Sequence, residues 1–392
     1  MNLKIFHTAD IHLGLQFSKY PDDLSKKLRE GRFETLVRMV QTANAERCQL
    51  FVVGGDMFDT TQVAKKLVVQ AAKILSEFEG VVVVLPGNHD FITGTDPSTH
   101  NDLWSAFQEA HSDRVLLLTE KKPYSLKSFD LDVCLYPAPC QNKHSKTHAV
   151  SWLESTEKAE DTTYHVGLAH GSFEGVSADI EGEYYPMKKD DLLVHKMDIW
   201  LMGHIHIQYP QKPGASDKIF YPSTPEPDGF DCRHEGRAWI LEVDPEKRVT
   251  ARSTSTGHYR FLQDSVRIES QADLDLLKLR YKGDSFKNTL VKLTLEGSLA
   301  KAEYATLNSL LQALKDDLLF LKYDDSGVRV KLTPSDIDSE FTPESFPHLL
   351  LTSLSGKTQS TESLDSPELH EDRDALQLAY ELIQELKQGA AK

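Results

Sequence analysis

His204 and His206 stand two residues apart at the end of an apolar run in the segment DIWLMGHIHIQYP, residues 198–210. Side chains at positions i and i+2 of an extended chain lie on the same side, so both imidazoles are expected to point toward one place. A neutral imidazole is a common metal ligand, and a polar ring at the end of a buried strand is costly to desolvate without a partner. This spacing indicates a metal site, provided that other segments supply further ligands.

Four other apolar runs also end in side chains that bind metal ions. Each run stops at a Gly, Asp or His, and carboxylate, amide or imidazole groups follow. Together with the two histidines above, the candidate ligands are Asp10, His12, Asp56, Asn88, His170, His204 and His206. In an open α/β sheet, ligands bind at the carboxyl ends of the strands, so groups from separate strands meet there. The sequence therefore predicts that these side chains converge.

Carboxylate, imidazole and amide ligands together suit a divalent first-row ion such as Mn²⁺ or Fe²⁺ better than an all-sulfur zinc site does. The candidate ligands are too many for one ion, and a carboxylate can bridge two ions about 3.5–4 Å apart, the spacing of hydrolytic two-metal centres. A lone histidine at a strand end more often has a structural role, and we apply that interpretation to His7, His165 and His195. The joint pattern, in contrast, predicts a two-metal centre.

The apolar runs that carry the ligands predict strands at 3–12, 50–56, 81–90, 164–171 and 198–206. Fully apolar runs bounded by turn residues are typical of a sheet that is covered on both faces. Segments 32–46 and 63–78 have apolar residues at three- and four-residue spacing, which predicts helices between the early strands. Strands that alternate with helices indicate an α/β fold, and we assign it to a first domain at 1–265.

The character of the sequence changes beyond this first domain. Residues 270–332 predict a small α+β domain that ends in a hairpin, and residues 333–370, rich in Ser, Thr, Pro and acidic residues, predict a linker. Residues 371–388 predict an amphipathic helix. Its positions at helical spacing are Leu376, Ala379, Tyr380, Ile383 and Leu386 or Lys387. This face needs a surface to cover, either on the chain itself or on a partner protein.

The composition limits the class of protein. The chain has 392 residues, of which 40% are hydrophobic, and a formal net charge of −16, which disfavours a general nucleic-acid binder. The four cysteines form no CxxC pair, which fits single thiols in a reducing compartment. Since the sequence shows no apolar run of membrane-spanning length and no signal segment, we expect a cytoplasmic protein without a membrane span.

The ligand segments occur as DxH, GDxxD, GNHD, a single later His, and GHxH, in this order between residues 10 and 206. This order resembles the calcineurin-like metallophosphoesterase superfamily. Within it, HTADIHLG, GGDMFDT and GNHD are similar to the SbcD-type DNA repair exonucleases. YPSTPEP at 221–227 also resembles that group, which commonly has Gly where Ser223 stands, so this turn is expected to differ. The resemblance implies a layered α/β/β/α core, a small α+β cap domain and a C-terminal helical tail.

The resemblance also implies roles for individual residues. One ion would be held by Asp10, His12 and His206, the other by Asn88, His170 and His204, with Asp56 bridging the two. His89 would be the catalytic histidine rather than a ligand. Asp90 would orient His89 or a neighbouring loop, and Asp59 would support the ligands from behind without binding metal.

The function implied by the resemblance is Mn²⁺-dependent hydrolysis of DNA phosphodiesters by an exonuclease or endonuclease that processes DNA ends during repair. Because the sequence contains no GxxxxGK[ST] loop, the ATPase would be a separate SbcC-like coiled-coil protein, gripped by the helix at 371–388. The family also implies a homodimer through helices at 62–78 and 100–110. Two alternatives stay open: a phosphodiesterase for small nucleotides or other phosphodiesters, and a subunit that serves chiefly as a scaffold for DNA ends.

Overall fold

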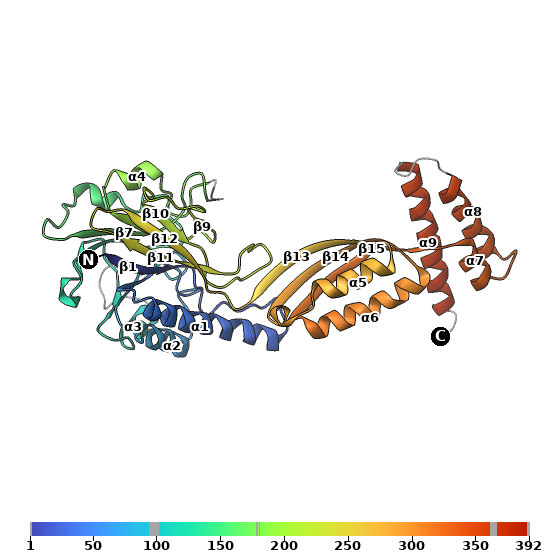
Figure 1. Ribbon diagram of the computed structural model, residues 1–392, viewed down its shortest axis with the longest axis horizontal. Helices are drawn as coiled ribbons and strands as arrows, with labels where there is room; N and C mark the ends of the chain where they lie inside the picture. The colour runs from blue at the N-terminus through green and yellow to red at the C-terminus, as the bar shows by residue number, and fades with distance from the viewer. Residues whose placement is uncertain (1, 94–101, 178, 180, 361–366, 390–392) are drawn as a thin grey trace. The chain divides into compact units, whose positions relative to one another are not determined.

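The computed structural model describes residues 2–93, 102–177, 179, 181–360 and 367–389 of the chain (Figure 1). Contacts between its Cα atoms divide it into two compact units, Met1–Arg260 and Phe261–Lys392. The boundary lies a few residues before the expected one at 265, because a single strand, β13 (Arg260–Ile268), leads from one unit into the other.

The first unit contains a six-stranded sheet in the order β12-β11-β1-β2-β3-β4. Its strands are β1 (Leu3–Thr8), β2 (Leu50–Val53), β3 (Val81–Val84), β4 (Val115–Leu117), β11 (Arg237–Val243) and β12 (Val249–Ser255). Strands β1 to β4 are parallel, whereas β11 pairs antiparallel with both β1 and β12. The carboxyl ends of the first three strands therefore lie at one edge of this sheet.

A second six-stranded sheet in the same unit has the order β5-β6-β7-β8-β10-β9. Its strands are β5 (Tyr124–Ser125), β6 (Val133–Ala138), β7 (Tyr164–His170), β8 (Ile199–Gly203), β9 (Gln208–Tyr209) and β10 (Ile219–Pro222). The central four, β6, β7, β8 and β10, are parallel. Two of the predicted ligand-bearing runs belong to this sheet, so the candidate ligands come from both sheets.

The two sheets pack face to face, and helices cover the outer face of the first. Ile5 and Val52 of the first sheet pack with Leu168 and Leu201 of the second in one buried cluster. The opposite face of the first sheet is covered by α1 (Asp22–Ala45), α2 (Lys65–Leu75) and α3 (Asp102–Gln108). Since alternate residues of a strand face opposite sides, fully apolar strands suit these covered faces.

The outer face of the second sheet is covered by shorter pieces. Trp200 and Met202 of β8 pack with Leu192 of α4 (Lys189–Leu193) and Leu153 of a 3₁₀ turn, Ser151–Ser155. Figure 1 shows α4 on one side of these strands and α1 to α3 on the other. The predicted layered α/β/β/α architecture is confirmed. The helix expected at 32–46 begins ten residues earlier, because buried Leu24 and Leu28 continue the same apolar period.

The second unit contains a three-stranded sheet with the order β13-β14-β15. Helices α5 (Gln271–Arg280) and α6 (Lys301–Asp317) accompany strands β14 (Thr289–Ala300) and β15 (Phe320–Lys331). The hairpin expected near 320–332 is wrong: β15 is one strand, parallel to β14, and α6 makes the crossover that a parallel pair requires. The DDSG segment suggested a turn, but the β14–β15 register shifts at this segment as a bulge does.

Helices occupy most of the described part of the linker expected at 333–370. They are α7 (Pro334–Glu340) and α8 (Phe346–Ser360), followed by α9 (Pro367–Gly389). The polar residues that suggested a linker include helix-start signals: the Thr333 side chain accepts from the backbone of Asp336, and Pro334 follows at the first helical position. The composition of this segment therefore predicted a linker at a position where helix α7 begins.

The apolar face predicted on the last helix packs, at least in part, against the chain itself. Leu376 and Tyr380 of α9 are buried in a cluster with Ile337 and Phe341 of α7 and Leu351 of α8. The apolar face was expected to pack either on the chain itself or on a partner protein. Its buried residues, Leu376 and Tyr380, pack on the chain itself. None of the described helices is long and apolar enough to cross a membrane.

Leu351→Ala tests whether the segment that suggested a linker is a packed helix. Leu351 is fully buried, so the truncation should lower local stability by about 2–5 kcal/mol. Hydrogen exchange of the amides in α7 to α9 measures this loss. The matched control is Leu349→Ala on the same helix, where the side chain is 57% exposed and the change should be within about 0.5 kcal/mol. Equal exchange in the two variants would contradict the packing described here.

Candidate metal centre

All seven predicted ligands lie at the carboxyl ends of strands from both sheets. Asp10, Asp56 and Asn88 follow β1, β2 and β3, whereas His170 ends β7 and His204 follows β8 directly. The backbone amide of His204 donates to both carboxylate oxygens of Asp10, at 3.1 Å each, which ties the two sheets together at this edge.

One group of ligands consists of Asp10, His12 and His206. Their candidate ligand atoms all lie within 4.8 Å of one another. The His206 Nε2 atom is 3.7 Å from Asp10 Oδ1, and the His12 Nε2 atom is 3.9 Å from Asp56 Oδ2. His12 is buried, and its Nε2 atom has no hydrogen-bond partner among the described residues. A buried nitrogen without a partner beside carboxylates fits a cation between them.

The second group of predicted ligands gathers around the same Asp56 oxygen and the amide oxygen of Asn88. His170 Nε2 lies 3.2 Å from Asp56 Oδ2 and 3.0 Å from Asn88 Oδ1, and His204 Nδ1 lies 3.1 Å from the same Asn88 oxygen. His170 Nδ1 donates to the Gly54 carbonyl at 2.9 Å, which leaves Nε2 facing the site. Asp56 thus approaches a histidine of each group, as a bridging ligand would.

Local backbone geometry aims these side chains. Asp10, His12, Asp56 and His204 all have positive φ angles, 54°, 47°, 50° and 95°, a region that non-glycine residues seldom adopt. Such strained conformations concentrate at functional sites. A Cβ atom on Gly87 would lie 2.2 Å from Asp56 Oδ1, so only glycine fits beside this carboxylate. The glycines of the GGD and GNHD motifs thus have a steric reason to be there.

Burial and mutual charge shift the pKa values of the clustered carboxylates and imidazoles in opposite directions, and the attraction of Asp56 raises the pKa of His170 to about 9 although burial alone would lower it. Burial by itself would raise the pKa of Asp56, but the attraction of His170 and His12 outweighs burial and lowers it. Burial raises the pKa of Asp10, against the opposing effect of His206 and His170. Burial, and then the charge of His170, lower the pKa of His204 to about 3. His204 is therefore a neutral imidazole at physiological pH, the form that binds metals.

His89 lies next to this cluster with one ring nitrogen occupied. Its Nδ1 atom is 2.9 Å from the Asp59 carbonyl oxygen, which can only accept, so Nδ1 carries the proton and Nε2 is left available. The His89 backbone amide donates to Asp56 Oδ1 at 2.8 Å. The His89 and His12 rings meet edge to face with centroids 4.8 Å apart. This geometry places a proton-transfer group beside the ligands.

Asp90 supports the loops rather than His89 itself. Its buried carboxylate accepts from the backbone amides of Phe58 at 3.0 Å and Gly87 at 2.7 Å, joining the GDMFD and GNHD turns. Burial and then the charge of Asp56 raise the pKa of Asp90 to about 7, despite these hydrogen bonds. Of the two roles expected for Asp90, orientation of a neighbouring loop agrees with these contacts.

Two carboxylates stand behind the imidazoles of the first group. Asp59 Oδ1 lies 3.4 Å from His12 Nδ1, the supporting position expected for it, and Asp228 Oδ2 lies 3.9 Å from His206 Nδ1. A carboxylate near the far nitrogen attracts the ring electrostatically, and one that accepts a hydrogen bond from that nitrogen makes the ring a stronger ligand. Sequence reasoning missed Asp228, because it follows β10 and no motif spacing links it to His206.

Arg32 of α1 is a second residue that sequence reasoning missed. It is fully buried, its Nη1 atom donates to the Ile11 carbonyl at 2.5 Å, and its Nη2 atom is 3.8 Å from Asp228 Oδ2. It therefore holds the DxH turn and keeps a positive charge beside Asp228. The sequence signal that could have indicated this role is an arginine at a position where the helical spacing of apolar residues predicts burial, because a buried arginine needs a partner.

Ser223, expected to alter its turn, has a φ angle of 81° that glycine would adopt without strain. Its hydroxyl is buried and donates to the His206 carbonyl at 3.1 Å. The substituted residue thus adds a hydrogen bond to the chain segment that carries a candidate ligand.

The sequence pattern of the family described as Calcineurin-like phosphoesterase matches residues 3–208, more than half of the chain. The chain belongs to the calcineurin-like phosphoesterase family. Members of this family are metallophosphoesterases with a dinuclear divalent metal centre, and the matched region contains every predicted ligand. The convergent carboxylates, the neutral His204 and the unpartnered Nε2 atom of His12 fit such a centre.

Two curated relatives illustrate the similarity to known proteins. The uncharacterized metallophosphoesterase YhaO of Bacillus subtilis is 24% identical over 345 residues, covering 80% of this chain and 78% of YhaO. The DNA double-strand break repair protein Mre11 of Methanopyrus kandleri is 22% identical over 242 residues, covering 57% of this chain. The chain matches 49% of the length of that second relative.

Solved phosphoesterase-like structures resemble the chain only distantly. TT1561 of Thermus thermophilus has a TM-score of 0.41 at 11% identity and covers 64% of this chain and 99% of its own. The purple acid phosphatase PPD1 from yellow lupin has a TM-score of 0.38 at 14% identity and covers 65% of this chain and 52% of its own. Family membership rests on the sequence match.

Asp228→Asn should weaken metal binding at the first ligand group. The neutral amide no longer attracts the His206 ring electrostatically from 3.9 Å, and losing a group that supports a ligand typically costs about 10–100-fold in metal affinity. Titration calorimetry of metal-stripped protein with Mn²⁺ measures this change. Asp231→Asn is the matched control, since it makes the same substitution at an exposed residue three positions away. If Asp228→Asn binds Mn²⁺ as tightly as the control, Asp228 does not position His206.

Proposed function

We propose that this metallophosphoesterase is a Mn²⁺-dependent DNA phosphodiesterase that processes DNA ends. The observation that carries the hydrolytic part is the convergence of seven metal-binding side chains beside His89. DNA as the substrate is supported by the similarity to Mre11, a DNA double-strand break repair protein, and by the motifs that resemble SbcD-type exonucleases. Thr60 and Asp90 also differ from the Arg and Glu usual in protein phosphatases of this superfamily.

When bound, two divalent ions supply Lewis acidity to a phosphodiester and make a shared water more acidic. Asp10, His12 and His206 would hold one ion, and Asn88, His170 and His204 the other, with Asp56 between them. Asp59 and Asp228 behind the first group fix two of these imidazole rings. Most of these side chains are buried, so few rotamers compete with the binding geometry.

His89 would supply the proton that the departing alkoxide needs. Its Nδ1–H donates to the Asp59 carbonyl, which turns Nε2 away from that carbonyl. The ring is partly exposed, unlike Asp10 and His170, so a substrate can reach it. Histidine suits this work because its ordinary pKa lies near working pH.

His89→Asn should keep metal binding and lose turnover. The side chain is expected to act as an acid and not as a ligand, so the rate should fall by roughly 10² or more. Steady-state rates, with metal content measured on the same samples, check both parts. A variant that loses its bound Mn²⁺ would show that His89 is a ligand.

A comparison of substrates tests the proposal as a whole. Purified protein with Mn²⁺ is incubated with end-labelled DNA, a bis-aryl phosphodiester and a phosphopeptide. The proposal expects cleavage of DNA and of the bis-aryl diester and no release of phosphate from the peptide. Cleavage of the bis-aryl diester without DNA cleavage would favour the small-phosphodiester alternative. If Asp56→Asn abolishes DNA cleavage in vitro and repair in cells, the scaffold alternative is excluded.

The partner of this nuclease would be an SbcC-like coiled-coil ATPase that binds α9. The buried face of α9 is occupied by α7 and α8, but Leu378, Leu382 and Leu386 are 58%, 51% and 73% exposed at a spacing of four residues. A continuous apolar stripe of this kind is what a coiled coil or helical partner recognises.

Replacement of Leu378, Leu382 and Leu386 by Ser should therefore abolish co-purification with the ATPase and preserve Mn²⁺-dependent hydrolysis. Pull-down of the co-expressed ATPase and the bis-aryl assay measure the two properties. Phe346→Ser with Leu349→Ser on α8 is the control, because it removes two exposed apolar side chains elsewhere in the same unit. Retained binding by the triple variant would reject α9 as the docking helix.

A homodimer stays a prediction. Val68, Ala71, Ala72 and Leu75 of α2, which suggested an interface, are buried in the chain's own core. Part of the second expected helix, residues 100 and 101, lies outside the described residues. A dimer would have to use the remaining surface of α2 and α3.

A further inference from the structure

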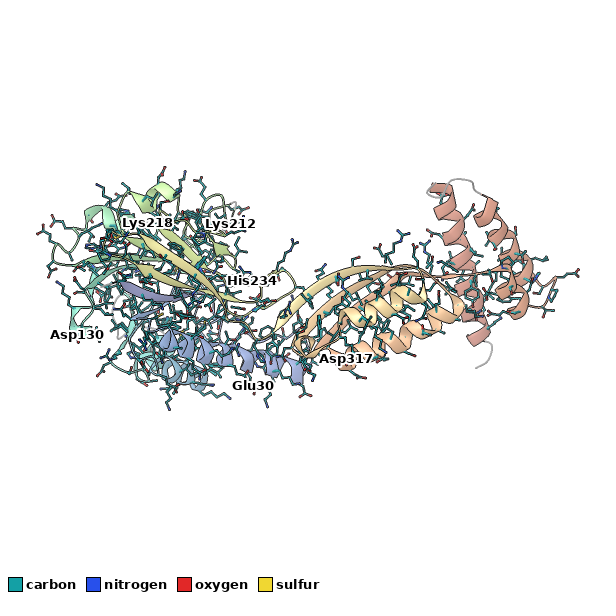
Figure 2. All side chains as sticks on the ribbon, viewed as in Figure 1. Glu30, Asp130, Lys212, Lys218, His234 and Asp317 are labelled. Carbon is teal, nitrogen blue, oxygen red and sulfur yellow. The ribbon has the colours of Figure 1, made fainter. Side chains whose placement is uncertain are left out.

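A hollow of about 480 Å³ lies beside the metal centre and shares one wall with it. His206 forms this wall: its Nε2 atom faces Asp10, while its Nδ1 atom faces Asp228, which also lines the hollow. The remaining walls come from the segment after β8 and from the loop between β10 and β11; Figure 2 labels two of these lining residues, Lys212 and His234. Pockets that bind small ligands measure roughly 300–1,000 Å³, so a single nucleotide unit fits.

Three cationic side chains line the hollow without a direct partner among the described residues. Lys212, Arg233 and Arg237 line it, are exposed, and their side chains make no hydrogen bond or ion pair within the described part of the chain. By contrast, Arg260 in the same unit is paired with Glu235. In a chain of net charge −16, three unpaired cations around one hollow make a local anion site.

Two carboxylates also line the hollow, and one of them is already engaged. Asp228 lies between Arg32, at 3.8 Å, and His206, at 3.9 Å. Asp231 is exposed. Three cations therefore face one engaged and one solvated carboxylate, which leaves the hollow attractive to phosphate. The apolar side chain of Ile207, 46% exposed on the same wall, offers a surface for a ribose or a base.

We propose that this hollow is a subsite for the nucleotide that flanks the scissile phosphodiester, with Arg233 and Arg237 binding its phosphate. The proposal rests on the proposed DNA-cleaving function and adds a specificity element to it. A phosphodiester at the metal centre would lie next to His206, and the other side of His206 lines the hollow that holds these cations, so the next phosphate along the strand would enter this hollow. Contacts between cations and the phosphate backbone do not depend on base sequence. The subsite therefore distinguishes substrates with a flanking nucleotide from substrates without one, whatever the base.

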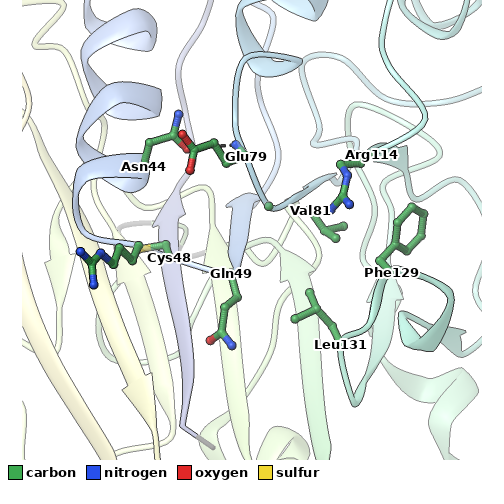
Figure 3. Close-up of a pocket in the computed structure, with 10 residues that line it drawn as sticks. Asn44, Cys48, Gln49, Glu79, Val81, Arg114, Phe129 and Leu131 are labelled. Atoms are coloured by element: carbon green, nitrogen blue, oxygen red, sulfur yellow. Dashed lines mark hydrogen bonds between the residues drawn. The ribbon is translucent and has the colours of Figure 1, made fainter.

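A second hollow contains an arginine whose removal serves as a control for the loss of positive charge. It measures about 250 Å³ and lies near the amino ends of β2 and β3, at the opposite end of the strands from the metal ligands. Figure 3 shows Arg114 there beside Val81 and Phe129. Its guanidinium is exposed and makes no ion pair with the described residues. Arg114→Ala therefore removes one arginine charge far from the metal centre, half of the charge that the double variant described below loses.

The experiment compares two substrates in wild type, the double variant Arg233→Ala with Arg237→Ala, and Arg114→Ala. A single-stranded tetranucleotide has flanking phosphates, and a bis-aryl phosphodiester has none. The double variant should raise KM for the tetranucleotide about tenfold or more, with kcat within about twofold, and flatten the dependence of KM on salt. Its hydrolysis of the bis-aryl diester and its Mn²⁺ content should equal those of wild type.

The remaining outcomes of this experiment reject either the subsite alone or the subsite together with the proposed DNA-cleaving function. An unchanged KM for the tetranucleotide in the double variant rejects the subsite, while the nuclease function stands. A rise in KM for both substrates places the two arginines in the general machinery, and an equal rise in Arg114→Ala shows an effect of net charge; both reject the subsite. If wild-type protein hydrolyses the bis-aryl diester and leaves the tetranucleotide intact, the proposed DNA-cleaving function fails, and the subsite fails with it.

Discussion

Two buried carboxylates, Asp10 and Asp56, share the small space where strands of both sheets end, and this crowding of like charges governs the rest of the site. The side chains of Asp10 and Asp56 are 0% and 2% exposed, so water cannot screen them. Burying unpaired charge is expensive, and a protein offsets it by pairing, protonation or a bound cation. The surrounding imidazoles relieve the repulsion only in part, since burial keeps His204 neutral. A pair of divalent cations resolves this conflict, and the family to which the chain belongs uses such a pair.

The strain in the surrounding backbone follows from the same constraint. Four of the ligand residues adopt positive φ angles, and the GGD and GNHD motifs leave no room for a Cβ atom next to His170 or Asp56. Asp59 and Asp228 lie near the far nitrogens of two of the rings, while Asp90 joins the turns that carry Asp56 and His89. The packed core of the first unit thus holds Asp10 and Asp56 close together although their charges repel each other. Functional sites commonly carry such unfavourable interactions, and the rest of the fold compensates for them.

The sequence predicted best those features whose residues lie close together along the chain. Each ligand follows an apolar run by a few residues, so the strands and the ligands could be predicted together. Asp228 and Arg32 could not be found in this way, because their partners lie far along the chain and depend on how β10 and α1 pack. The single strand β15 was predicted as a hairpin, since a bulge and a turn use the same small polar residues. Helices α7 and α8 were predicted as a linker, because this segment is rich in Ser, Thr, Pro and acidic residues, and at the start of α7 some of these residues form a helix cap.

The measurement that tests this account most directly is the number and position of ions bound at the strand ends. Crystals of the protein soaked in Mn²⁺ can be examined by anomalous scattering at the manganese edge. The account predicts two peaks about 3.5–4 Å apart, the spacing of two-metal centres, with the Asp56 carboxylate between them. A single peak, or two peaks that Asp56 does not bridge, would contradict it.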